Sequence, residues 1–170
     1  TLTVTSAADD GAGSLRQAIA GLCAGGTITF GSDYTVLLAS ELAIGKSLTI
    51  DGAGHNVTIS GNHATRVFNL TGGTIALNRL TIADGYFDAG YSGESGAGIR
   101  VNGSTLNLTN STVSGNVTGW PGGGGLELRS GAANVSNSIF IGNSGNYGGG
   151  IDTSSSTTLN VSNSTFTGNS

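Results

Sequence analysis

The side chains best placed for chemistry belong to Arg100, Glu127 and Asp152, each two residues after a glycine. The runs that contain them are Gly98-Ile-Arg-Val, Gly125-Leu-Glu-Leu and Gly150-Ile-Asp-Thr, offset by 27 (98 to 125) and 25 (125 to 150) residues. In stacked parallel strands such equivalent residues lie about 4.8 Å apart. Two carboxylates on adjacent strands approach the ~5–5.5 Å separation of retaining glycosidases, and a neighbouring arginine suits a uronate substrate. One hypothesis is therefore a polysaccharide lyase or glycoside hydrolase that uses Glu127 and Asp152.

The alternative interpretation is a solvated ladder of charges on the outer face of the strands. Arg100 and Glu127 would then form a surface pair that contributes about 0–1 kcal/mol. No histidine, tyrosine or second basic residue recurs at this position to complete a mechanism. This favours the ladder, and the sequence predicts no catalytic residues.

Aromatic residues gather in one class of loop, between the Gly-Asn (or Asp-Gly) signature and the glycine-rich run of each repeat. Exposed aromatic rings at one edge of a solenoid would suit carbohydrate stacking or a protein contact. Packing of the same rings over a neighbouring strand is the competing interpretation. The candidate binding residues are Tyr86, Phe87, Tyr91, Trp120 and Tyr147.

Metal and cofactor binding have weak support. Asp84, Asp88 and Glu94 surround one loop and offer oxygen ligands for calcium. Their spacing fits no dedicated calcium loop, so a plain acidic loop is favoured and no cofactor is expected. His55 and His63 lie in turns without repeated cysteine or histidine partners, so no metal site is predicted there.

Internal repeats specify the elements that must position these residues. Three ten-residue segments align without gaps, 107–116, 134–143 and 160–169, at offsets of 27 (107 to 134) and 26 (134 to 160) residues. Within each one, apolar and polar residues alternate with period two, which is typical of a strand with one buried face. Strands of about three to five residues cannot bury a face alone, so stacking into coils is required.

The predicted fold is all-β: a right-handed parallel β-helix with coils of about 26 residues and one short N-terminal capping helix. Phe140 and Phe166 are expected in one interior ladder above Val113 and Ile82. A turn residue that tolerates left-handed backbone recurs in each coil, and stacked amides there can bond along the ladder. These turn residues are Asn110, Asn137 and Asn163.

The capping helix is expected over residues 14–22. Ser14 and Gln17 fit a capping box, and an apolar face follows at helical spacing. Strands are expected at 2–4, 27–30, 47–50, 57–59, 67–70 and 74–77. We expect one domain over 1–170, comprising a cap and first coil (1–30), irregular coils (31–97) and regular coils (98–170). It would be the N-terminal part of a longer protein, with an open C-terminal end available to another copy or a fibre contact.

Composition narrows the classes of function. The net charge is −4 and only 9% of residues are charged, where about 25% is typical. Nucleic-acid binding needs a basic patch, so this class is disfavoured. No apolar run approaches the ~18 residues of a membrane span. The single cysteine, Cys23, has the neighbours Ala18, Ile19 and Leu22, so a buried thiol is predicted.

Three segments carry a family likeness: Gly13-Ser-Leu-Arg-Gln-Ala-Ile19, Gly26-Thr-Ile-Thr-Phe30 and Lys46-Ser-Leu-Thr-Ile-Asp-Gly52. They resemble the start of exported bacterial proteins with the CSLREA motif. The later coils resemble the β-helix repeats of polymorphic outer-membrane proteins and the pectin-lyase-like superfamily. The resemblance implies a secreted or cell-surface location. Gly13 stands where the motif has a cysteine, so a disulfide there is not expected.

Together these observations predict a non-catalytic extracellular module, structural or adhesive, that self-assembles or binds surface carbohydrate. The polysaccharide lyase or glycoside hydrolase is the alternative. Ice binding is a third class, because flat threonine-rich solenoid faces can do that. The mixture of Asn, Arg, Glu and Asp at outward positions argues against it.

Overall fold

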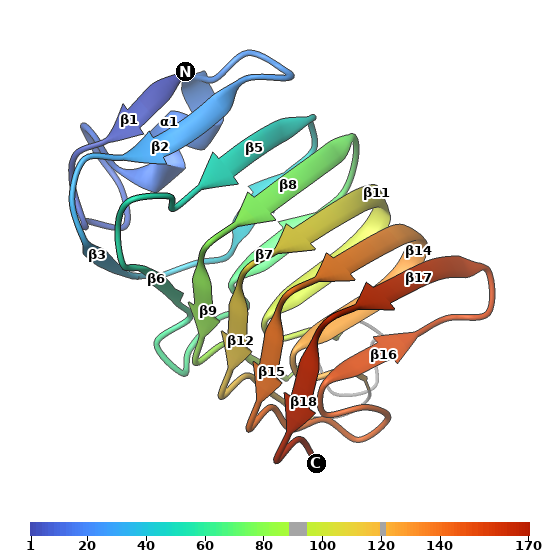
Figure 1. Cartoon of the computed structure of the whole chain (residues 1–170). Coiled ribbons are helices and arrows are strands. Elements are labelled where there is room, and N and C mark those ends of the chain that lie inside the picture. Colours follow the sequence, from blue (N-terminus) through green and yellow to red (C-terminus); the bar gives the residue numbers. More distant parts are fainter. Residues whose placement is uncertain (89–94, 120–121) are drawn as a thin grey trace.

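The structure is a computed structural model that describes residues 1–88, 95–119 and 122–170. The chain forms a parallel β-solenoid of about 6 turns with one short helix at its N-terminal end, shown in Figure 1. All the paired strands run parallel to their neighbours, and each strand pairs with the equivalent strand of the next coil. The fold class predicted from the repeats is therefore confirmed.

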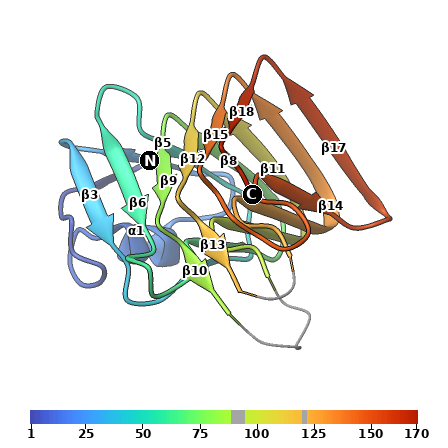
Figure 2. The same ribbon diagram turned by 90° about the horizontal axis from the view of Figure 1, so that it is seen from below.

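Two long sheets wind along the solenoid as its first and second faces (Figures 1 and 2). Short strands with alternating burial build both faces, because inward-pointing apolar residues alternate with outward-pointing residues that are mostly polar. On the second face, Leu37, Ile139 and Ile141 are apolar residues that point out. The first face contains β1 (Leu2–Val4), β2 (Thr27–Phe30), β5 (Leu48–Asp51), β8 (Thr74–Asn78), the later parts of β11 (Ile99–Thr109) and β14 (Leu126–Ser136), and β17 (Thr157–Ser162). The second face contains β3 (Tyr34–Leu37), β6 (Val57–Ser60), β9 (Thr81–Ala83), β12 (Thr112–Ser114), β15 (Ile139–Ile141) and β18 (Thr165–Thr167).

A third face closes the coil. It consists of β4 (Leu42–Ile44), β7 (Phe68–Leu70), the first parts of β11 and β14, and β16 (Ile151–Thr153). The strands β11 and β14 turn the corner between the third and first faces, and their register shifts near Asn102. A small pair, β10 (Tyr86–Phe87) and β13 (Val117–Thr118), lies outside the three faces.

The register between coils agrees with the predicted ladders. Val113 pairs with Ile82 and with Phe140, and Phe140 pairs with Phe166. The two phenyl rings stack with centroids 4.9 Å apart and planes 13° from parallel. Dispersion and apolar burial along such columns produce one continuous core, which extends from Val4 through Phe140.

Coil lengths are less regular in the first half of the chain. Successive register partners on the first face are Leu2, Ile28, Ile50, Leu77 and Leu108, which gives steps of 26, 22, 27 and 31 residues (28−2, 50−28, 77−50 and 108−77). The strands β3 and β4 were not predicted, because neither belongs to a repeated signature.

The helix α1 (Leu15–Gly21) begins where the sequence predicts. The hydroxyl of Ser14 accepts a hydrogen bond from the backbone amide of Gln17 at 3.1 Å. The side chain of Gln17 reaches back to the amide of Gly13 at 2.9 Å, one residue before the position that a capping box uses. Leu15, Ala18 and Ile19 are buried on the face that covers the N-terminal cross-section of the core.

The repeated turn asparagines adopt the predicted left-handed backbone. The φ angles of Asn110, Asn137 and Asn163 are 51°, 50° and 49°. The side-chain amides of these three residues do not bond to one another as predicted. The side chain of Asn110 donates instead to the Oδ1 atom of Asn78 at 2.9 Å. Stacked amides occur at two other positions of the repeat, one outward and one buried.

The buried amide ladder consists of Asn116, Asn143 and Asn169, the last residue of each Gly-Asn signature. The amide nitrogen of Asn116 donates to the Oδ1 atom of Asn143 at 2.8 Å, and Asn143 donates in the same way to Asn169 at 2.9 Å. Each Oδ1 also accepts the backbone amide of the preceding asparagine. Asn116 and Asn143 are fully buried, so this ladder fixes the spacing of coils from inside.

The prediction of a buried thiol at Cys23 is wrong. Its thiol is exposed, although Leu22 beside it is buried. The helix ends at Gly21, so Cys23 falls after the helical spacing that would have turned it inward.

We predict that Asn143→Ala lowers the free energy of unfolding by about 3 kcal/mol or more, because buried donors and an acceptor lose their partners. Asn134→Ala is the matched control: it lies in the same coil but is only half-buried and bonds to Asn107. Its expected cost is about 1 kcal/mol. Urea denaturation followed by circular dichroism measures both, and equal costs would contradict a structural role for the buried ladder.

Candidate functional site

The pairing of the strands aligns the predicted column of charged residues. Arg100 pairs with Glu127 and Glu127 pairs with Asp152, on the third face of the solenoid. Asn69 precedes Arg100 in the same column. The strands therefore bring together the three residues that the sequence singled out.

The prediction that this column is solvated is wrong. Glu127 is only 1% exposed, Arg100 is 8% exposed, and Asp152 is half-buried. Ser95, Gly96 and Gly122 lie against this column. A side chain at Gly96 would meet Glu127 and Arg100, and a side chain at Gly122 would meet Ser95. The side chains of Arg100 and Glu127 therefore point away from the apolar core and are still buried.

Protein groups surround the carboxylate of Glu127. The Oγ atom of Ser95, itself buried, donates a short hydrogen bond to Oε1. The Nη1 atom of Arg129 lies 3.7 Å from Oε1, and the Nε atom of Arg100 lies 3.9 Å from Oε2. Oε2 accepts no hydrogen bond from the described residues. Two guanidinium groups thus neutralise one buried carboxylate.

This environment argues against hydrolysis by Glu127 and Asp152. A glycosidase carboxylate must touch the sugar that it attacks or protonates. Glu127 has almost no accessible surface and is already held by Ser95 and Arg129. The column is better described as a buried ion cluster to which Ser95 is hydrogen-bonded.

Sequence reasoning missed a second buried cation, Arg66, which is 1% exposed. Its Nε atom donates to the carbonyl of Gly96 at 2.7 Å, and Nη1 donates to Glu41 at 2.7 Å. Its guanidinium lies 3.9 Å from the ring centroid of Phe87. Arg66 therefore links Ser95 and Gly96 to Glu41, the residue directly before β4. No repeated signal marks Arg66 or Glu41, because neither residue belongs to the aligned segments.

Of the five predicted aromatic binding residues, the structure describes three. Tyr147 is 65% exposed and Tyr86 is 38% exposed, whereas Phe87 is half-buried under Arg66. Tyr86 pairs with Val117, which bridges to Ser144, so Tyr86 and Tyr147 lie on one edge of the solenoid. Tyr91 and Trp120 lie outside the described residues.

The candidate metal ligands do not converge in the described part of the chain. No group of three or more His, Cys, Asp or Glu side chains there could hold a metal ion. Asp84 accepts a hydrogen bond from Ser60 at 3.4 Å, and Glu94 lies outside the described residues. His63 lies 3.9 Å from Asp84, and His55 lies 3.3 Å from Asp33. Each histidine therefore has one carboxylate neighbour.

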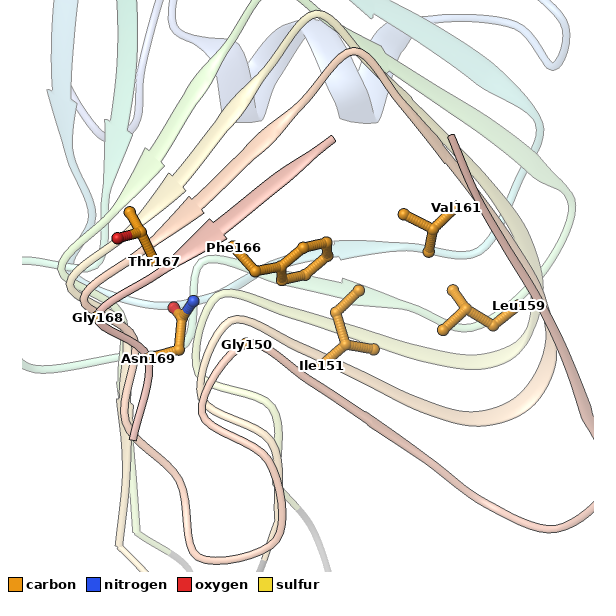
Figure 3. Close-up of a pocket in the computed structure, with 8 residues that line it drawn as sticks. All are labelled: Gly150, Ile151, Leu159, Val161, Phe166, Thr167, Gly168 and Asn169. Atoms are coloured by element: carbon orange, nitrogen blue, oxygen red, sulfur yellow. The ribbon is translucent and has the colours of Figure 1, made fainter. Parts of the chain in front are cut away.

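The last coil forms a hollow at the C-terminal end, shown in Figure 3. Its apolar lining comes from Ile151, Leu159, Val161 and Phe166, with Asn169 at one side. Val161 and Phe166 are each 44% exposed, whereas Val135 and Phe140 in the preceding coil are buried. The hollow is the open cross-section of the core.

The outer side of the first face carries an uncharged amide ladder. Asn134 donates to Asn107 at 2.8 Å, and Asn160 donates to Asn134 at 2.9 Å. Threonine and serine side chains flank it at Thr109, Ser136 and Ser162 in register. The two bonded amides keep this surface regular from coil to coil.

Comparison of the chain with protein-family models, with curated proteins and with solved structures gave no match. The fold and this site define the class as a parallel β-solenoid repeat protein. Within the described residues, no helix is long and apolar enough to cross a membrane.

We predict that Glu127→Gln destabilises the protein by about 3 kcal/mol, because Arg100 and Arg129 lose a buried anionic partner. Asp152→Asn, in the same column but half-buried, should change stability by less than about 1 kcal/mol. Thermal and urea unfolding of both variants measures this. Similar effects of the two substitutions would show that Glu127 is not held as described.

A pH effect is expected at Asp33. Hydrogen bonds from the backbone amide and then the side chain of Asn56 lower its pKa, with a smaller contribution from His55. A lowered pKa stabilises the fold above the ordinary value near 3.8, and this is lost as the pH falls through the lower folded-state value. Urea midpoints measured from neutral to acidic pH should therefore separate wild type from Asp33→Asn near neutrality and converge in acid. A constant separation would contradict this linkage.

Proposed function

We propose that the chain is a non-catalytic structural module of an exported or cell-surface protein, and that its C-terminal end pairs with a further parallel coil of the same repeat. The observation that carries this proposal is that the last coil exposes the columns that earlier coils bury (Figure 3). The resemblance of the cap and repeats to CSLREA-type exported bacterial proteins supports the location.

The exposed apolar groups continue an interface that already exists within the chain. Phe166 stacks on Phe140 with one face of its ring, and its exposed fraction is 44%. Val161 pairs in register with the buried Val135, and its exposed fraction is the same as that of Phe166. Another coil with an aromatic or β-branched residue at each position would bury them, because coil on coil is how this core is built.

Backbone N–H groups at the same end point toward the space where a following coil would lie, and they indicate what could fill it. Asn137 and Gly142 each donate a backbone hydrogen bond to the coil after them, to Ser162 and Thr167. Their equivalents, Asn163 and Gly168, donate to no backbone carbonyl in the part of the chain that the structure describes. A coil in the same parallel register supplies those carbonyl groups, and its signature asparagine extends the ladder beyond Asn169.

A whole second copy fits less well than a single coil. The N-terminal cross-section of the core is covered by α1, which buries Leu15, Ala18 and Ile19 against it. Stacking the C-terminal end on that surface would place a helix where parallel strands are needed. We therefore assign the open end to a repeat coil. The exposed rings of Tyr86 and Tyr147 remain the predicted adhesive contacts along the edge.

We predict that a second copy of residues 145–170, joined after Ser170, continues the solenoid in register. Hydrogen exchange at the amides of Asn163 and Gly168 should slow by at least about tenfold, because both gain carbonyl partners. The control carries aspartate in the added coil at the positions equivalent to Leu159, Val161 and Phe166, and should give no protection.

Equal protection by the control coil would contradict the proposal, as would fast exchange at Asn163 and Gly168 in both variants. Sedimentation of the 170-residue chain checks whether two copies cover the open end, and a dimer with these amides protected would also contradict it. Release of sugar products from polysaccharides, abolished by Glu127→Gln without loss of folding, would contradict the non-catalytic role.

A further inference from the structure

We propose that the outer surface of the first face adsorbs to ice. This activity goes beyond the structural role proposed above, and it uses neither the aromatic edge nor the C-terminal end. The surface lies on β8, β11, β14 and β17, parallel strands that run side by side in Figure 1. Three columns of outward residues cross these strands, and together they form the polar array.

The polar array repeats in register from coil to coil. Its first column consists of Thr74, Thr105, Ala132 and Thr158. Its second column consists of Ala76, Asn107, Asn134 and Asn160. Its third column consists of Asn78, Thr109, Ser136 and Ser162. The register shifts between β11 and β14 lie earlier, near Asn102, so each column presents small polar or methyl groups at a constant step.

The backbone sets the two repeat distances of the array. Equivalent residues on neighbouring parallel strands lie about 4.8 Å apart, and alternate residues along one strand lie about 6.6 Å apart. Oxygen atoms on a prism face of hexagonal ice repeat at similar distances in two perpendicular directions. Water bound to hydroxyl, amide and methyl groups with this rectangular repeat can therefore continue into the crystal.

Hydrogen bonds within the array fix its side chains. Asn134 lies between Asn107 and Asn160 and bonds to both, at 2.8 and 2.9 Å. The hydroxyl of Thr109 donates to the Oδ1 atom of Asn78 at 2.9 Å. Apart from Asn160 in the last coil, these side chains are half-buried, so only part of each one reaches solvent. Ordering of water on such a surface costs little additional side-chain entropy.

The mixture of residue types that argues against ice in the sequence is divided between two faces. Arg100, Glu127 and Asp152 lie on the third face. None of the residues in the three columns, all of which the structure describes, is charged. Asp51 borders the array on its N-terminal side, where the amide of Asn78 donates to it at 2.7 Å. Contact with ice would strip water from a charged group at high cost, so a neutral surface favours adsorption.

The other faces of the solenoid suit ice less well. The second face also has a threonine column, at Thr58, Thr81 and Thr112. These residues line a hollow of about 220 Å³ beside Arg79, and a flat crystal surface cannot fill it. The third face carries the ion cluster around Glu127. The polar array contains no aromatic residue in its described columns, so it also lacks the ring stacking that sugar binding uses.

The test measures thermal hysteresis and the shape of growing ice crystals in solutions of the full chain. Ala76→Lys and Ala132→Lys each place a long charged side chain within the array, at outward positions where the fold should be retained. Each should abolish most of the hysteresis that wild type shows, because adsorption would strip water from the ammonium group. Ala64→Lys makes the same substitution in an exposed turn after β6 and should behave as wild type. Circular dichroism and urea midpoints check that all three variants are folded.

Three results would overturn the proposal. The first is a wild-type chain that gives no hysteresis and leaves ice crystals unfaceted. The second is unchanged hysteresis in both folded array variants. The third is an equal loss in Ala64→Lys, which would show that added charge anywhere on the chain is responsible. Failure of this test leaves the coil-pairing result unaffected, because the array lies along the side of the solenoid and not at its C-terminal end.

Discussion

The buried amide of the Gly-Asn signature holds each regular coil against the next. Asn143 bonds to coils on both sides, through Asn116, Asn169 and the carbonyl of Val113. It is fully buried, and a glycine at the start of the third-face strand leaves the room it needs. A side chain at Gly125 would meet first the carbonyl oxygen of Gly150 and then Asn143, and one at Gly98 would meet first the carbonyl oxygen of Gly125 and then Asn116. Glycine and asparagine are therefore one packing unit, repeated once per coil.

Everything else in the regular half follows from the register that this unit sets. Phe140 lies over Val113 and under Phe166, and the outward amides of Asn107, Asn134 and Asn160 meet only because the coils are in phase. The same phase brings Arg100 and Glu127 together beside Ser95 and Gly96. At the C-terminal end, the same register exposes the apolar side chains of Val161 and Phe166 and the backbone amides of Asn163 and Gly168.

Repetition explains which features were predictable from the sequence. Phe140, Phe166 and the left-handed turn asparagines recur at a fixed step, so one coil predicts the next. The burial of Glu127 was not predictable in this way, because it depends on Ser95 and Gly96, which lie outside the aligned segments. Arg66 pairs with Glu41 outside the aligned segments, and Cys23 follows a helix that ends two residues earlier. Periodicity thus predicts the core and not the loops that cover it.

Exchange of side-chain amide hydrogens tests the buried ladder most directly, in the folded protein and without substitution. The carboxamide hydrogens of Asn116 and Asn143 should exchange far more slowly than those of Asn146, an exposed asparagine that bonds to Gly119. Protection close to that of the core backbone amides is the result that this structure predicts. Exchange of Asn116 and Asn143 as fast as that of Asn146 would contradict it, since the amides would then not hold the coils in register.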